Sequence, residues 1–212
     1  MSFSPRRPSL PVDRRAKVEA AILAATERLL STGVSFTELG IGQIAAEAGI
    51  ARPTFYLYFR DKTELMLRLV QMLGLGSFEA TSDTPIDLEA ITQAYRESIA
   101  FFRERKHVMA AIFEVAGYDE AVRQAWESVM DRFVQREVRL LRAEQSAGRT
   151  PADLDPETAA EIINWGGSQL IVRQVTSRGP ERDESIAREL AELQFYGFYR
   201  RPAGRGASSP SG

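Results

Sequence analysis

The chain has 212 residues, of which 44% are hydrophobic and 26% are charged, a composition ordinary for one large or two small globular domains. It contains no cysteine, which excludes a disulfide scaffold, a thiolate zinc site and a cysteine nucleophile. No apolar run approaches the roughly 18 residues of a membrane span, and no hydrophobic stretch follows the amino-terminal charges. We therefore expect a cytoplasmic protein with no membrane partner.

The net charge of −2 hides a small asymmetry along the chain. Residues 1–64 carry 9 Arg and Lys against 7 Asp and Glu, a balance of +2, whereas the remainder carries 18 against 22, a balance of −4. Five basic residues fall within the first 17 residues. The same segment contains three prolines, the last of them Pro11, and proline opposes helix formation. We predict that residues 1–12 form a flexible basic arm, which either screens DNA phosphates or is simply a solvated tail.

The first predicted domain spans residues 13–73 and begins with one long amphipathic helix. This helix should run from about Asp13 to Ser31, with Gly33 ending it, because apolar residues recur at spacings of four, three and four: Val18, Ile22, Ala25 and Leu29. A fourth helix should start at Asp61, with Glu64 as its reciprocal capping partner, and run to about residue 73.

Between these helices, residues 41–62 carry the most specific pattern in the chain. The stretch IGQIAAEAGI predicts a two-turn helix closed by Gly49, and Pro53 predicts that another short helix starts near Arg52. Two short helices joined by a glycine turn are the arrangement that lays one helix across a DNA backbone and the next in the major groove. The aromatic residues of the second helix could all be core, but we expect burial only for Phe55 and Phe59.

The run IGQIAAEAGIARPTFYLYFRDKTELM resembles the helix-turn-helix signature of the tetracycline-repressor (TetR) family. More loosely, RPTFYLYF and the region around Trp126 and Phe133 resemble the mycobacterial ethionamide-activation repressor type within that family. The resemblance implies an all-α fold of about nine helices. It consists of an N-terminal three-helix helix-turn-helix domain and a C-terminal helical domain for ligand binding and dimerisation.

The candidate DNA-binding residues lie in and around the second short helix. Their side chains can reach phosphates or base edges, or are assigned to DNA by the resemblance: Gln43, Arg52, Thr54, Tyr56, Leu57, Tyr58 and Lys62. Lys62 also fits on physical grounds, because a helix N-terminus and an ammonium group together attract an anion. The sequence departs from the family at Gly40 and Ala51, where Ser or Thr often caps the two short helices.

The second predicted domain covers residues 78–200, and residues 201–212 should be a disordered tail. Its first helix should be capped by Thr84 with Pro85 in the first position. Start and stop signals then predict four more helices, near residues 107–116, from Asp119 to about Ala147, from Asp155, and after Gly179-Pro180.

The family resemblance implies that this domain encloses a cavity for a small apolar effector. The candidate wall residues are mostly large and apolar: Phe102, Phe113, Trp126, Met130, Phe133, Asn164 and Trp165. The alternative is that they are ordinary core. The Gly166-Gly167 pair predicts a kink or a close backbone approach beside Asn164.

The same resemblance implies a homodimer that reads an inverted repeat in double-stranded DNA, with the last helices pairing across a two-fold axis. The candidate interface residues are Ile186, Leu190 and Leu193.

Two other classes of protein were weighed. An enzyme has little support, because the single histidine, His107, lies in a charged run and no metal, cofactor or nucleophile motif is present. A helical adaptor remains an alternative, binding a protein partner through the aromatic residues of the last helix: Phe195, Tyr196, Phe198 and Tyr199. The preferred interpretation is a repressor that a small apolar ligand releases from its operator.

Overall fold

The computed structural model describes residues 11–76 and 86–202, and within these ranges it contains helices and no strand. The α-helices, with the shorter π- and 3-10 turns between them, are α1 (Pro11–Ser31), α2 (Ile41–Glu47), α3 (Arg52–Phe55), α4 (Lys62–Gly76), α5 (Leu88–Glu104), α6 (Lys106–Ala116), α7 (Glu120–Ser146), α8 (Pro156–Glu161), η1 (Ile162–Gly166), α9 (Gly167–Ser177), η2 (Pro180–Arg182), α10 (Asp183–Gln194) and η3 (Phe195–Tyr199). The predicted all-α class is confirmed.

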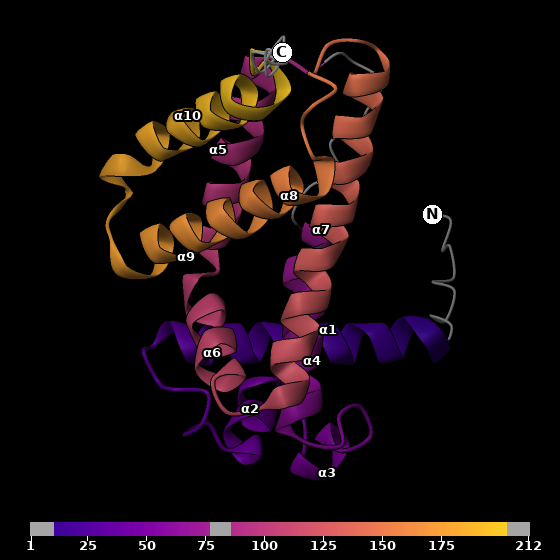
Figure 1. Cartoon of the computed structure of the whole chain (residues 1–212). Helices are drawn as coiled ribbons and strands as arrows, with labels where there is room; N and C mark the ends of the chain where they lie inside the picture. The colour runs from indigo at the N-terminus through magenta and orange to yellow at the C-terminus, as the bar shows by residue number, and fades with distance from the viewer. Residues whose placement is uncertain (1–10, 77–85, 203–212) are drawn as a thin grey trace, which may run out of the picture.

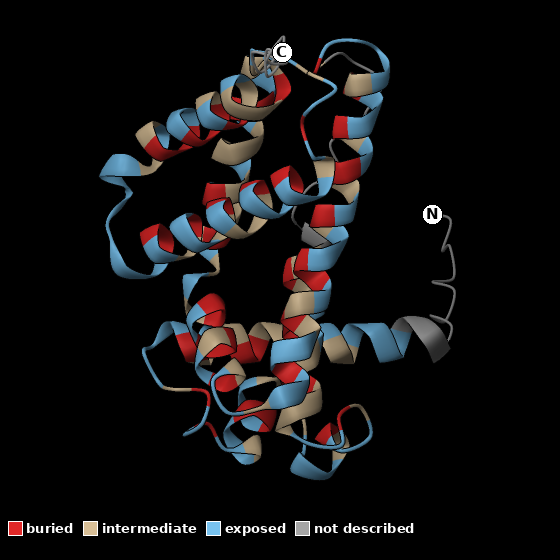
Figure 2. Ribbon diagram, viewed as in Figure 1, coloured by how far each residue is buried: buried red, intermediate tan, exposed pale blue. Residues whose placement is uncertain are grey.

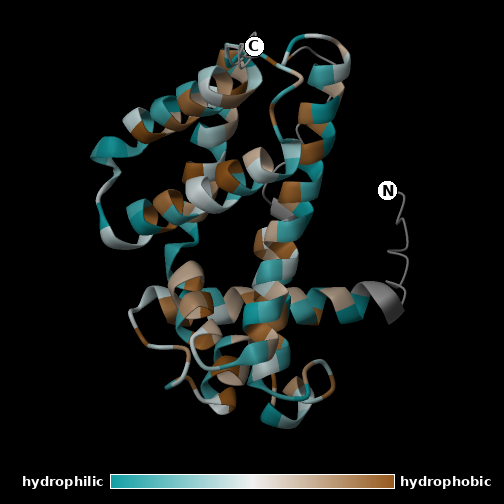
Figure 3. Ribbon diagram, in the orientation of Figure 1, coloured by the Kyte–Doolittle hydropathy of each residue, from teal (hydrophilic) through white to brown (hydrophobic). Residues whose placement is uncertain are grey.

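The helices form a small head and a larger body (Figure 1). The head holds α1 to α3 and the beginning of α4, with α2 and α3 at the end farthest from the body. The body holds α5 to α10, and α7 runs from it down to the head, where α4 and α6 pack against α7 and α6 also packs against α1. Buried positions follow the sides on which helices face one another (Figure 2). Hydrophobic and hydrophilic positions alternate along α7 and α9, as expected for amphipathic helices (Figure 3).

The first helix begins two residues earlier than the sequence predicted. Its first residue is Pro11, which had been assigned to the non-helical arm. Proline fits at the first position of a helix because its missing N–H has no partner there and its φ is already helical. Residues 1–10 of the predicted arm, like residues 203–212 of the predicted tail, lie outside the described residues.

The fourth helix continues three residues past its predicted end, from 73 to Gly76. Gly74 belongs to the packed part of this helix, since a Cβ atom placed on it would lie 2.8 Å from Cγ2 of Val129 on α7. The glycine therefore permits a close approach of α4 and α7 instead of ending the helix. The predicted Asp61 cap is present, with Asp61 Oδ1 accepting from the N–H of Glu64 at 2.8 Å. Glu64 reaches back to the N–H of Arg60 and not to that of Asp61.

The fifth helix starts later than predicted. Asp87, and not Thr84, caps it, because the Asp87 carboxylate accepts from the N–H of Ala90 at 2.7 Å. Thr84 and Pro85 lie outside the described residues. The other start signals of this domain are confirmed, with Asp119 capping α7 and Asp155 preceding α8.

The kink predicted at the Gly-Gly pair is a π-helical turn, Ile162–Gly166, inserted between α8 and α9. A close approach occurs there as well, because a Cβ atom on Gly167 would lie 3.6 Å from the hydroxyl oxygen of Tyr95 on α5. Turns of this kind interrupt a helix where side chains need an altered direction. This interruption lies on the wall of the cavity described below.

Candidate DNA-binding face and ligand cavity

The turn between α2 and α3 has the backbone that the sequence predicted. Gly49 has a φ of +69°, a conformation that costs glycine little, and the N–H of Ile50 bonds to the carbonyl of Ala45 at 3.0 Å. Gly40 and Ala51 occupy the two N-cap positions with extended backbone and no side-chain hydrogen bond. As predicted, neither α2 nor α3 has a capping side chain at its N-terminus.

The aromatic residues at the end of α3, which stops at Phe55, and in the turn after it divide as expected. Phe55 and Phe59 are buried, with ring centroids 5.5 Å apart, and they belong to the core of the head. Tyr56 is exposed, and Tyr58 is half-buried with the guanidinium carbon of Arg15 5.8 Å from its ring centroid. The two tyrosines thus leave polar groups on the outer surface of α3.

The other candidate DNA-binding residues lie on the same end of the head. Arg52 and Leu57 are exposed, Leu57 with 72% of its surface, and Thr54 is half-buried. An apolar side chain with that much free surface contributes almost nothing to the core. Gln43 is exposed as well, although its amide oxygen already accepts from the N–H of Gly40 at 2.7 Å. Its amide NH₂ group donates no hydrogen bond to any described residue.

Lys62 has a structural role that the sequence did not reveal. Its ammonium group donates to the carbonyl oxygens of Phe36 at 2.5 Å and Thr37 at 3.0 Å, and it lies 4.7 Å from the centroid of the Phe36 ring. Burial lowers the pKa of Lys62, while the nearby Glu114 carboxylate opposes that shift. Two of the three ammonium protons are therefore used to hold the loop before α2, which leaves one for a phosphate.

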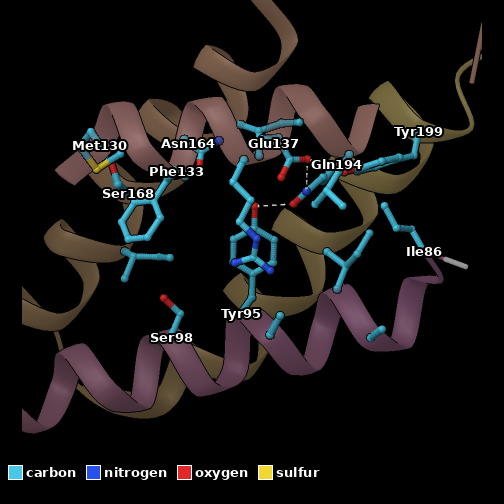
Figure 4. A pocket seen from close by; sticks show the side chains of 18 of the residues that line it. Ile86, Tyr95, Ser98, Met130, Phe133, Glu137, Asn164, Ser168, Gln194 and Tyr199 are labelled. Atoms are coloured by element: carbon cyan, nitrogen blue, oxygen red, sulfur yellow. Dashed lines mark hydrogen bonds between the residues drawn. The ribbon is translucent and has the colours of Figure 1, made fainter. Parts of the chain in front are cut away.

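The body contains a partly open cavity of about 420 Å³ between α5, α7, α9 and the end of α10 (Figure 4). Five of the seven predicted wall residues line it: Phe102, Trp126, Met130, Phe133 and Asn164. Its size is that of a site for a small organic molecule. Asn164 already donates through Nδ2 to the carbonyl of Ala160 at 2.9 Å, so its amide oxygen and its second N–H are left for a ligand.

Phe113 and Trp165, the other two predicted wall residues, are not among the residues that line this cavity. Phe113 stands behind the wall, with its ring edge against Trp126 and the two ring centroids 5.4 Å apart. Trp165 is half-buried and packs against two hydrophobic clusters, one that includes Met130 and Ile171 and another that includes Val138 and Ile163. Both are apolar residues of α-helical or π-helical segments, so their spacing alone did not separate the cavity wall from the layer behind it.

The sequence analysis missed a group of polar residues at one end of the cavity (Figure 4). Glu137 Oε1 accepts hydrogen bonds from Gln194 Nε2 at 2.9 Å and from the Tyr199 hydroxyl at 2.7 Å. The Tyr95 hydroxyl donates to Gln194 Oε1 at 2.8 Å. Burial raises the pKa of Glu137, against the effect of both hydrogen bonds, and it also raises the pKa values of Tyr95 and Tyr199.

A second carboxylate near this end is neutralised by arginine. Glu144 accepts from Arg149 at 2.6 Å and from Arg200 at 2.9 Å. The hydrogen bond from Arg149 is the main reason that the pKa of Glu144 lies below the usual range. Glu137 has no salt-bridge partner among the described residues, so the two buried carboxylates have different electrostatic environments.

The predicted dimer residues are not equivalent. Ile186 and Leu190 are buried inside the protomer, where α10 packs against α5, and they expose almost no surface to a partner. Leu193 is 58% exposed. An amphipathic helix does not reveal from its pattern whether its apolar side meets its own chain or a second copy, and this ambiguity led to the choice of Ile186 and Leu190.

The described residues hold no group of three His, Asp or Glu side chains that could bind a metal ion. No helix in the described ranges is long and apolar enough to cross a membrane.

Comparison with protein families assigns both parts of the chain. Residues 22–69 match the model described as "Bacterial regulatory proteins, tetR family", and residues 91–195 match "Transcriptional regulator EthR, C-terminal domain". The regulator EthR of Mycolicibacterium smegmatis is 30% identical over 85% of this chain and 86% of its own length. The protein belongs to the TetR family. It is a transcriptional regulator of the EthR type, and not an enzyme.

Other TetR-family proteins extend the comparison. EthR of Mycobacterium tuberculosis is 25% identical over 79% of this chain and 80% of its own length. The solved structure of FadR from Bacillus subtilis, in complex with stearoyl-CoA, has a TM-score of 0.70 at 16% identity and covers 84% of this chain and 98% of its own. PfmR from Thermus thermophilus has a TM-score of 0.65 at 18% identity and covers 82% and 96%. At these identities the two structures show the shared fold alone.

Proposed function

We propose that this TetR-family regulator is a homodimeric repressor that binds an inverted repeat and is released when a small, mostly apolar molecule fills its cavity. The observation that carries the proposal is the cavity itself, about 420 Å³ with a wall of aromatic and aliphatic side chains, in the body of a protein whose head carries a helix-turn-helix. A cytoplasmic location accords with this role.

The head would read DNA through α3 and the start of α2. The candidate contacts remain those predicted from sequence: Gln43, Arg52, Thr54, Tyr56, Leu57, Tyr58 and Lys62. Support comes from the exposure of Arg52, Tyr56 and Leu57 at one end of the molecule, where their side chains have free surface for a partner. Leu57 is suited to contact a thymine methyl group or a sugar.

The cavity and the head are connected through neighbouring residues of α6. Phe113 packs on Trp126, whose other side faces the cavity. The next residue, Glu114, accepts hydrogen bonds from Ser35 and Thr37 in the loop before α2. A ligand that moves Trp126 would therefore act on α6 and on the loop that Lys62 also holds. By linkage, a ligand that weakens operator binding tenfold must favour the DNA-free conformation by about 1.4 kcal/mol.

The dimer would form through the outer sides of α9 and α10 and of their adjoining π-turns. Exposed apolar residues gather on these elements: Ile162, Leu170, Leu193 and Tyr196. We substitute them for Ile186 and Leu190 as the proposed contact residues, because only side chains with free surface can bury it against a partner.

The experiment that tests the proposal is to sequence the DNA that the purified protein retains and then to footprint the protein on it. We expect two protected half-sites that are related by a two-fold axis and whose centres lie a whole number of DNA helical turns apart. Protection of one unsymmetrical half-site would exclude a homodimer that binds an inverted repeat. Retention of no duplex at low salt would favour the adaptor alternative, which is already weakened by Tyr199, since this aromatic residue is buried against Glu137 and unavailable to a partner.

A further inference from the structure

The polar end of the cavity is organised around one oxygen of Glu137. Gln194 Nε2 and the Tyr199 hydroxyl both donate to Oε1, and the Tyr95 hydroxyl fixes the orientation of the Gln194 amide. These four residues come from α7, the end of α10, η3 and α5. Two donors thus hold one oxygen of the carboxyl group in place, and Figure 4 shows this group beside the cavity.

The second oxygen, Oε2, accepts no hydrogen bond from any described residue, although Glu137 is only 9% exposed and lines the cavity. Oε2 is also absent from the fully enclosed polar atoms without a partner among the described residues, so it retains some accessible surface, and Glu137 is one of the residues that line the cavity. A buried carboxyl group with one oxygen bonded by the protein and one open to a cavity is an acceptor prepared for a ligand.

The charges around the cavity leave Glu137 as the group that lacks a counter-ion. Two guanidinium groups also line the cavity, but Arg149 is paired with Glu144, whose other oxygen bonds to Arg200. Arg136 favours the ionised form of Glu137 through its charge, but this effect is the smallest of those that act on the pKa of Glu137. Removal from water therefore dominates, and burial raises the pKa of Glu137.

The rest of the cavity is apolar, with Phe102, Trp126, Met130 and Phe133 around its other end. We propose that the effector is an amphiphilic amine, whose apolar body lies among these side chains and whose protonated nitrogen donates to Glu137 Oε2. This inference rests on the proposed function, because it names the chemical class of the ligand that fills the same cavity.

An amine is favoured over other donors by the electrostatics of the site. A hydrogen bond between two charged groups is roughly twice as strong as one between neutral groups, and it returns to the carboxylate the stabilisation lost on burial. A neutral alcohol would bond to Oε2 without supplying charge. A carboxylate ligand would place a second negative charge beside the buried Glu137, which is unfavourable because two like charges repel each other at short distance.

The test uses the full-length protein and three ligands of equal chain length: n-octylamine, 1-octanol and octanoate. Calorimetric titration at pH 7 should show the amine binding at least tenfold more tightly than the alcohol, with octanoate weakest. Glu137→Gln should reduce the affinity for the amine to that for the alcohol. The affinity for the alcohol itself should stay within about twofold of the wild-type value. The matched control is Glu127→Gln, which removes a carboxylate from an exposed position on the same helix, outside the cavity, and should preserve the preference.

Equal or tighter binding of the alcohol or of octanoate to the wild-type protein would overturn the proposal, and so would a Glu137→Gln protein that keeps the amine preference. The wild-type comparison decides the matter by itself if the variant does not fold. Binding by none of the three ligands would also overturn the amine class. The repressor proposal is judged separately, by the footprint, and it survives if the alcohol or octanoate binds and releases the operator.

Discussion

Thr37 Oγ1 donates a hydrogen bond to Glu114 Oε1 across 2.6 Å, and this bond joins the loop before α2 to α6 of the body. The same carboxylate oxygen accepts from Ser35 at 2.8 Å, and Thr37 also contacts the hydroxyl of Tyr118 at 2.8 Å. The bond from Thr37 is the main reason that the pKa of Glu114 is lowered. The position of the head is therefore coupled to α6 by a group that stays ionised at neutral pH.

Replacing this carboxylate should loosen the head without unfolding it. In Glu114→Ala, the loop before α2 loses its bonds to α6, so we expect faster amide hydrogen exchange at residues 34–40 and a several-fold weaker operator affinity. Glu104→Ala removes a more distant carboxylate, one that is exposed and pairs with Arg105, and serves as the control. Unchanged exchange in the loop would show that α6 does not hold the head through Glu114.

Filling the cavity from its wall should imitate a bound ligand. Gly167 lines the cavity and faces Tyr95, whereas a Cβ atom on Gly166 would meet nothing within 4 Å. Gly167 is therefore the position from which a new side chain would fill the cavity. Gly167→Leu should weaken operator binding about tenfold and leave helix content intact, while Gly166→Leu should have little effect. Equal behaviour of the two variants in a DNA shift assay would count against the cavity as the regulatory site.

The close approach of α4 and α7 should be sensitive to a single methyl group. Gly74→Ala would place Cβ 2.8 Å from Cγ2 of Val129, so the helices must separate, and we expect a loss of about 1 to 3 kcal/mol in the free energy of unfolding. The matched control is Gly42→Ala in α2, where no atom lies within 4 Å of the new methyl group. That change should stabilise the protein by about 0.5 to 1 kcal/mol through the greater helix propensity of alanine. Equal effects in denaturant titrations would refute the packing argument.

Sequence reasoning succeeded where the determinants were local. Asp119 and the turn at Gly49 are signals read over four or five neighbouring residues, and the structure places both as expected. It did not find Glu137, because this residue sits in the charged stretch QREVR and its partners Gln194 and Tyr199 lie about sixty residues away. One signal was present, since Glu137 follows Phe133 by four residues and so falls on the same side of the helix as the aromatic stripe. A charged residue within such a stripe indicates a functional site.

The paired carboxylate Glu144 should give the stability of the protein a dependence on pH. Its pKa is lowered in the folded state by the hydrogen bond from Arg149 and by Arg200, so its contribution is present above the ordinary carboxylate pKa and is lost as the pH falls through the folded value. Glu144→Gln should therefore lower the stability by about 2 kcal/mol at pH 7, with the difference from the wild type shrinking below about pH 4. Thermal melts of both proteins across pH 3 to 7 measure this, and a constant difference would contradict it.

The proposed dimer depends on apolar residues that have free surface. Leu170 on α9 and Leu193 on α10 are 38% and 58% exposed. If these surfaces meet across a two-fold axis, the double variant Leu170→Asp, Leu193→Asp buries carboxylates against apolar groups and against their own copies, so sedimentation should show monomers. Val34→Asp provides the control, because Val34 is an exposed apolar residue of the segment between α1 and α2 and belongs to neither α9 nor α10. A helix content equal to that of the wild type would show that the double variant is folded.

Dimers that persist in the double variant would move the interface to another surface, whereas loss of dimers in the Val34→Asp protein would make the dissociation non-specific. Since each half-site would then be read by a single head, the monomer should also lose most of its operator affinity, which ties the oligomeric state to DNA binding in one experiment.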